Sequence, residues 1–71
     1  MKIQVQCRHS GDPRTFLVGA RRLEATRVLE RAAENSLRRF RVRVFTGVSS
    51  YCVRTYTTGD WRLAGVRAQP R

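Results

Sequence analysis

Three arginines alternate with apolar residues in the most basic stretch of this sequence and could contact a run of phosphates. Arg39, Arg41 and Arg43 are separated by Phe40 and Val42, the period of two that is typical of a β-strand. On a strand they would project from one face at intervals of about 6.6–6.8 Å, close to the phosphate spacing of a nucleic acid strand. Arginine suits this contact because its planar guanidinium donates two parallel hydrogen bonds to a phosphate.

Two later segments carry residues that can join these arginines on one face of an antiparallel sheet. If the strands pair in sequence order and in register, Arg54 and Arg62 lie beside the first three arginines, and Tyr56 shares a face with Arg54. An aromatic ring among arginines can stack on a base, and each stacked base contributes about 1–3 kcal/mol. The predicted nucleic-acid-binding residues are therefore Arg39, Arg41, Arg43, Arg54, Arg62 and Tyr56.

A solvated sheet face explains the same arginines without any partner. An antiparallel sheet that packs on a core with one face leaves its other face in water. Arginine keeps such a face soluble, and charge on the edge strands opposes edge-to-edge pairing. Chains encoded by GC-rich genomes are also rich in arginine, because arginine codons are GC-rich. Both interpretations stay open at this point.

The whole chain carries a strong positive charge. Its 71 residues include 15 Lys and Arg against 5 Asp and Glu, which gives a formal net charge of +10 at pH 7, and only Lys2 is a lysine. Such a surface favours a polyanionic partner, DNA or RNA first and then an anionic membrane or an acidic protein. No apolar run approaches the roughly 18 residues of a membrane-spanning helix. Polar residues follow Met1 almost directly, so we expect no signal peptide and a cytoplasmic protein without a membrane span.

Groups for catalysis and metal binding are sparse. Cys7 and His9 would share a strand face and form a thiolate–imidazole couple, but no third group orients them. A thiolate metal site needs paired Cys or Cys/His at close spacing, and the other cysteine, Cys52, has no such neighbour. We predict that the protein is not an enzyme and has no metal site and no cofactor. A Cys7–Cys52 disulfide is conceivable, but two free, half-buried thiols fit a reducing cytoplasm better.

Alternation and turn residues divide most of the chain into short β-segments. Strands are predicted at residues 2–8, 15–18, 39–44, 51–56 and 61–64. Gly19 and Ala20 form a predicted hairpin tip, because glycine supplies the positive φ of a tight turn. The large side chains expected in the core are Phe16, Phe40, Tyr51 and Trp61.

The stretch from Arg21 to Glu34 fits two structures. Helical spacing relates five of its apolar residues: Ala25, Val28, Leu29, Ala32 and Ala33. This periodicity favours a helix at about 24–34. Against it, residues 22–25 alternate directly after the Gly19 turn, like the return arm of a hairpin. A β-bulge near Thr26 and Arg27 would then return Val28 to the inward face.

The order of several short motifs resembles a family of small uncharacterised bacterial proteins. The similar segments, within residues 13–66, are PRTFLVG at 13–19, RRLEA at 21–25, VLER at 28–31, RFRVR at 39–43, YCVR at 51–54 and WRL at 61–63. The family pattern runs roughly PRxFxLGxRRLEVxEVLDRW, YFKVR, an Asp-Gly turn, YILRHD and WEL. The resemblance implies a β-hairpin across Gly19, and hence a strand after it. It implies no catalytic or binding residue, because the family has no known activity.

Three departures from the family pattern change its chemistry here. Residues 47–50, GVSS, stand in place of the Asp-Gly turn, and Thr55-Tyr56 stand in place of His-Asp. Ala32 or Ala33 stands where the family has Trp. The replacement of acidic positions makes this chain more basic, which is compatible with a shift toward an anionic partner.

We therefore expect a mainly β domain at residues 1–66, followed by a flexible basic tail at 67–71. The expected architecture is a small antiparallel sheet or half barrel, SH3-like or OB-like, of five or six strands. The alternative is an α+β fold with one helix at about 24–34 packed on the sheet. The expected function is electrostatic, sequence-tolerant binding of nucleic acid or another polyanion. The alternative is a protein–protein interaction module or a homo-oligomeric structural protein, and a thin core that leaves apolar sheet surface to cover would suit a homodimer.

Overall fold

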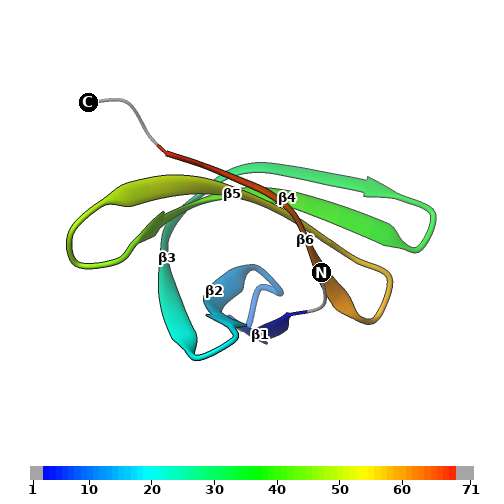
Figure 1. Cartoon of the computed structure of the whole chain (residues 1–71). Helices are drawn as coiled ribbons and strands as arrows, with labels where there is room; N and C mark the ends of the chain where they lie inside the picture. Colours follow the sequence, from blue (N-terminus) through cyan, green and yellow to red (C-terminus); the bar gives the residue numbers. More distant parts are fainter. Residues whose placement is uncertain (1–2, 69–71) are drawn as a thin grey trace.

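The computed structural model describes residues 3–68, which form six antiparallel strands and no helix (Figure 1). In chain order the strands are β1 (Gln4–Cys7), β2 (Pro13–Val18), β3 (Arg21–Glu34), β4 (Leu37–Phe45), β5 (Ser50–Thr57) and β6 (Trp61–Ala68). Each strand pairs with the next one along the chain, so the sheet order is β1-β2-β3-β4-β5-β6. The sheet curls into a half barrel, which confirms the predicted mainly β fold.

A continuous strand, β3, occupies the segment for which helical spacing predicted a helix at 24–34, so the helix prediction is wrong. The register of β3 against β4 shifts between Ala25 and Arg27 and again between Val28 and Glu30. Each shift marks a β-bulge, and each bulge adds one residue between successive inward positions. Inward residues are therefore three apart at these two places, and this spacing imitates one face of a helix. The bulge considered near Thr26 and Arg27 is confirmed.

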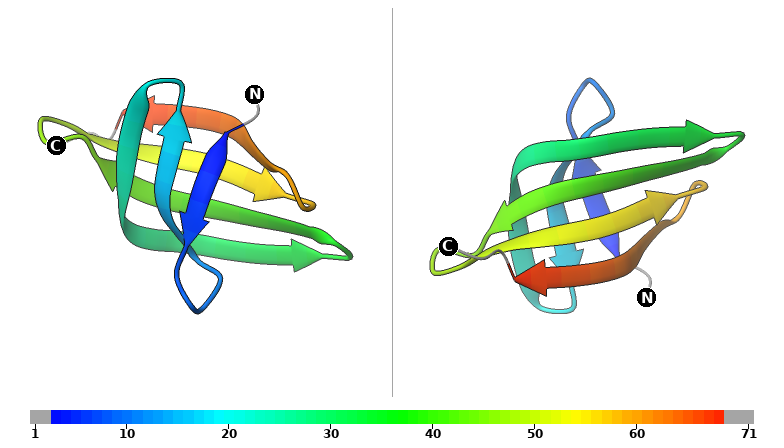
Figure 2. Two further views of the ribbon diagram at one scale, coloured as in Figure 1. Left: turned by 90° about the horizontal axis from the view of Figure 1, so that it is seen from below. Right: turned by 90° about the horizontal axis from the view of Figure 1, so that it is seen from above.

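The bulges also bend the strand. A β-bulge increases the local twist and turns the strand that carries it. The first part of β3, up to Glu24, pairs with β2, and the remainder pairs with β4. The β1–β2 hairpin consequently lies beneath the curved sheet of β3 to β6 and crosses it at a steep angle (Figures 1 and 2).

The two edges of the sheet meet at one point. The backbone N–H of Ile3 donates a hydrogen bond to the carbonyl oxygen of Trp61, with an N···O distance of 3.1 Å. Within residues 3–68 this is the only backbone hydrogen bond between the β1 end and β6. The barrel is thus closed beside the start of β6 and open along the rest of that strand.

The hydrophobic core fills the space between the hairpin and the concave side of the sheet. Its buried apolar residues are Ile3, Phe16, Phe40, Val42, Val44 and Val53. Phe16 and Phe40 are buried as predicted, whereas Tyr51 and Trp61 are partly buried against the core. The ring centroids of Phe40 and Trp61 lie 5.5 Å apart, a separation typical of favourable aromatic pairs.

Smaller features of the chain test three further expectations. Gly19 has a φ of 62° in the two-residue turn between β2 and β3, which confirms the predicted hairpin tip. Both cysteines are free, and Cys7 is exposed rather than half-buried, whereas Cys52 is partly buried. The last strand continues through Ala68, beyond the predicted domain end at 66. Residues 69–71 of the predicted tail lie outside the described residues.

Replacing Phe16 with Ala should lower the free energy of unfolding by about 3–5 kcal/mol, because a cavity replaces a large buried ring. Phe16 is 0% exposed, whereas the control residue Val48 is 86% exposed. Val48→Ala should change stability by less than about 0.5 kcal/mol. Urea unfolding followed by the fluorescence of Trp61 measures both effects, and equal effects would contradict the core position of Phe16.

Candidate nucleic-acid interface

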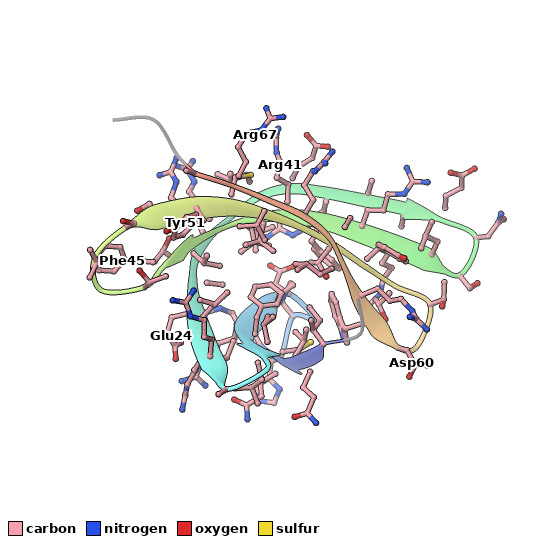
Figure 3. The ribbon with its side chains drawn as sticks, in the orientation of Figure 1. Glu24, Arg41, Phe45, Tyr51, Asp60 and Arg67 are labelled. Carbon is pink, nitrogen blue, oxygen red and sulfur yellow. The ribbon has the colours of Figure 1, made fainter. Side chains whose placement is uncertain are left out.

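The predicted arginines lie on the convex side of the sheet. In β4 the buried Val42 faces the core between Arg41 and Arg43, so these two side chains leave the opposite face. Figure 3 shows Arg41 on the outer side of the curved sheet, on the same side as Arg67 of β6. The strands that carry these residues, β3 to β6, lie side by side in the right-hand view of Figure 2.

Cross-strand register arranges this side in three rows from β3 to β6. The first row is Arg27, Arg43, Cys52 and Arg67. The second row is Glu30, Arg41, Arg54 and Gly65. The third row is Ala32, Arg39, Tyr56 and Arg62. Neighbours within a row are on strands about 4.7–4.9 Å apart, and successive rows are about 6.6–6.8 Å apart. All six residues singled out in the sequence therefore share one compact face.

Two further arginines of this surface are not among the predicted nucleic-acid-binding residues. Arg27 fell in the segment with helical spacing, and Arg67 was assigned to the tail. The bulge between Ala25 and Arg27 was the signal for Arg27, since it places this residue opposite Arg43. We call the complete set the arginine face: Arg27, Arg39, Arg41, Arg43, Arg54, Arg62 and Arg67.

Acidic residues neutralise only a small part of the arginine face. Glu30 lies 3.2 Å from Arg41, measured between Oε2 and Nη2, and Glu34 lies 3.9 Å from Arg39 between the same atom types. Among residues 3–68, no acidic side chain forms an ion pair with the other five arginines of the face. The face therefore keeps a clear excess of positive charge.

A shallow hollow lies in the middle of the arginine face. Its volume is about 230 Å³, and Arg39, Arg41, Arg54 and Tyr56 contribute to its lining. Gly65 leaves room for Arg54, because a Cβ atom at this position would lie 3.0 Å from Nη2 of Arg54. The Arg54 guanidinium can therefore extend across β6 at the side of the hollow.

Arg43 differs from the other members of the face. Its side chain is partly buried, and its Nε is buried without a hydrogen-bond partner in the described part of the chain. An unpaired buried donor costs stability, so replacing Arg43 would alter folding as well as any binding. Arg54 and Arg62 are exposed and are better suited to tests of binding.

Arg31 is separated from the arginine face because the second bulge of β3 turns it toward the concave side. Its Nε donates a hydrogen bond of 2.8 Å to Oδ1 of Asp12, and its Nη2 donates to Oδ2. This two-point contact ties the β1–β2 loop to β3. The hydrogen bond from Arg31 lowers the pKa of Asp12 below its ordinary value, and the same bond raises the pKa of Arg31.

Other chemical sites considered in the sequence are not assembled here. β1 ends at Cys7 and His9 lies in the turn that follows, so the two residues do not share a strand face. Within residues 3–68 no group of three His, Cys, Asp or Glu side chains is placed to hold a metal ion. No helix in that range is long and apolar enough to cross a membrane.

Replacing Asp12 with Asn should lower stability near neutral pH. The pKa of Asp12 is depressed in the folded state, so its ionisation stabilises the protein above the ordinary carboxyl pKa. This contribution is lost as the pH falls through the depressed pKa, and the two proteins should then become equally stable. Thermal unfolding across the acid range measures the difference. Asp60→Asn is the control, since the exposed Asp60 has no ion pair among the described residues. A constant difference at every pH would contradict this role for Asp12.

Comparison of the chain with family models, with curated proteins and with solved structures gave no match. The resemblance to the family of small bacterial proteins remains a prediction. The arginine face and the physical chemistry of its residues are the features of the molecule that bear on its function.

Proposed function

We propose that this protein binds nucleic acid electrostatically and with little sequence preference, through the arginine face. The observation that carries the proposal is the cross-strand register, which gathers seven arginines on four adjacent strands. Phosphates would contact the guanidinium groups, which donate hydrogen bonds in pairs and keep their charge at any physiological pH. Contacts to phosphates carry no sequence information directly, so the expected binding tolerates many sequences.

Repulsion between arginines that lie opposite one another in the arginine face supports the same proposal. Arg41 lies directly opposite Arg54, and Arg27 lies directly opposite Arg43. Like charges in directly opposed positions destabilise a sheet. A bound chain of phosphates would place negative charge between these pairs and remove that cost. A face that served solubility alone would gain nothing from placing arginines opposite one another.

Removing two exposed arginines of the face tests the proposal. Arg54→Gln with Arg62→Gln should weaken binding to all sequences about equally. It should also reduce the slope of log K against log salt by about 0.7–0.9 for each phosphate that the variant no longer neutralises. Fluorescence anisotropy of labelled single- and double-stranded DNA and RNA, from low to physiological salt, measures both quantities.

The matched control removes the same charge from the other side of the molecule. Arg8 and Arg14 are exposed on the β1–β2 hairpin, outside the arginine face. Arg8→Gln with Arg14→Gln should leave most of the affinity in place. Equal reductions in affinity for the two double variants would mean that only net charge attracts the nucleic acid, and the proposed interface would be rejected.

Tyr56 should add a contact that depends on unstacked bases. Its ring is partly exposed and is the cross-strand neighbour of both Arg39 and Arg62. Tyr56→Ala should weaken binding to single strands about ten-fold, whereas Tyr56→Phe keeps the ring and should have little effect. The same anisotropy assay measures both variants, and equal affinities for the Ala and Phe variants would contradict stacking by Tyr56.

The second candidate function is self-association or peptide capture through β6. Beyond the contact at Trp61, the outer edge of β6 pairs with no strand in residues 3–68. An unpaired edge can add a strand from another chain. Sedimentation at increasing protein concentration distinguishes this candidate, because self-association through β6 makes the apparent mass rise without nucleic acid.

A further inference from the structure

A second hollow opens on the concave side of the half barrel, on the opposite side of the sheet from the arginine face. Its volume is about 220 Å³, and residues of β2, β3, β4, β5 and β6 line it. Its principal apolar lining residues are Phe16, Leu23, Val44, Val53, Leu63 and Val66. The walls thus range from fully buried side chains such as Val44 to Val66, which is 52% exposed. Apolar surface that remains in contact with water at a concave site is typical of a ligand pocket.

Few polar residues line this hollow, and one of them is charged. Arg21 is the only ionisable lining residue that carries a charge at neutral pH, and no acidic side chain within residues 3–68 forms an ion pair with it. The hydroxyl of Thr46 is already engaged, because it accepts a hydrogen bond from the backbone N–H of Ser49. Tyr51 also lines the hollow, and its hydroxyl makes no hydrogen bond to the described residues.

We propose that this hollow binds a small amphipathic carboxylate, with its hydrocarbon part against the apolar walls and its carboxylate at Arg21. The hollow exceeds the cavity of about 150 Å³ that holds one benzene ring, so it suits a straight chain of about eight carbons. Arg21 supplies a charge-assisted contact for which no acidic side chain of residues 3–68 competes, and Tyr51 supplies a second donor. The proposal does not depend on nucleic-acid binding, since it uses a different side of the sheet.

Charge complementarity favours this ligand over a second copy of the chain. A second copy carries a formal net charge of +10 and would bring like charge toward Arg21. A carboxylate brings the opposite charge and needs no large interface. An uncharged lipid would contact the same apolar walls but would form no ion pair with Arg21.

Titration of the labelled protein with octanoate, followed by the shifts of its backbone amide resonances, tests the proposal. Shifts should saturate and concentrate at residues around the hollow, such as Val18, Leu23 and Val66. Shortening the ligand should weaken binding about four-fold for each methylene removed from the apolar walls. Acetate at the same ionic strength should produce no saturable shift at these residues.

Variants of two adjacent arginines separate recognition of the carboxylate from general attraction of anions. Arg21→Gln should weaken octanoate binding about ten-fold and leave the affinity for octanol unchanged. Arg22→Gln is the matched control, because Arg22 points to the other face of β3 and pairs with Glu24. It should leave both affinities unchanged.

Three outcomes would overturn the proposal. Octanoate shifts that spread evenly over the arginine face would show unspecific attraction of anions. Equally weakened octanoate binding in the two variants would show that Arg21 has no special role. Shifts at the hollow that grow with protein concentration in the absence of ligand would identify a second copy as the occupant.

Discussion

The bend in β3 is the constraint on which the rest of this structure depends. A straight strand of this length would give a flat sheet with two faces open to water. The register shifts after Ala25 and Val28 turn the strand, so that its first part follows the hairpin and its second part follows β4. Phe16 can then reach the same core as Val44, although β2 and β4 are not neighbours in the sheet. Without that turn the chain would bury less apolar surface, and a domain this small buries little to begin with.

Curvature of the sheet also separates apolar side chains from charged ones. The concave side takes most of the apolar residues of the alternating strands, and the convex side takes the seven arginines of the arginine face. Alternation in β4 and β5 makes this division strict, as shown by Val42 and Val53 inside and their neighbours Arg41 and Arg54 outside. A curved sheet spreads the outer side chains apart and brings the inner ones together. The same bend therefore tightens the core and reduces the repulsion between guanidinium groups.

Much of this fold can be predicted from the sequence, because period-two alternation is a local property. Arg39, Arg41 and Arg43 could be assigned to one face from their spacing alone, and their alignment with Arg54 needed only sequential pairing. The segment 24–34 could not be settled, since two bulges give a strand the apolar spacing of a helix. Arg67 was missed for a similar reason: the register of β6 shifts opposite Arg54 and Thr55, which breaks the simple alternation after Leu63. The hollow beside Arg21 had no signal in the sequence, because its lining residues come from five strands and are brought together only by the bend.

The single backbone hydrogen bond between Ile3 and Trp61 leaves β1 less firmly held than the central strands of the sheet. β1 has four residues, and its pairing with β2 has a register shift between Gln6 and Cys7. Within residues 3–68 the only backbone hydrogen bond toward β6 comes from Ile3, which precedes β1. Its amide hydrogens will therefore exchange with solvent through small local openings, while those of β4 and β5 exchange only when the whole domain unfolds. Each such opening briefly bares the edge of β2, a strand rich in apolar residues. β1 thus protects the edge of β2. The rate of local opening of β1 therefore determines how often that edge is free to pair with a strand of another molecule.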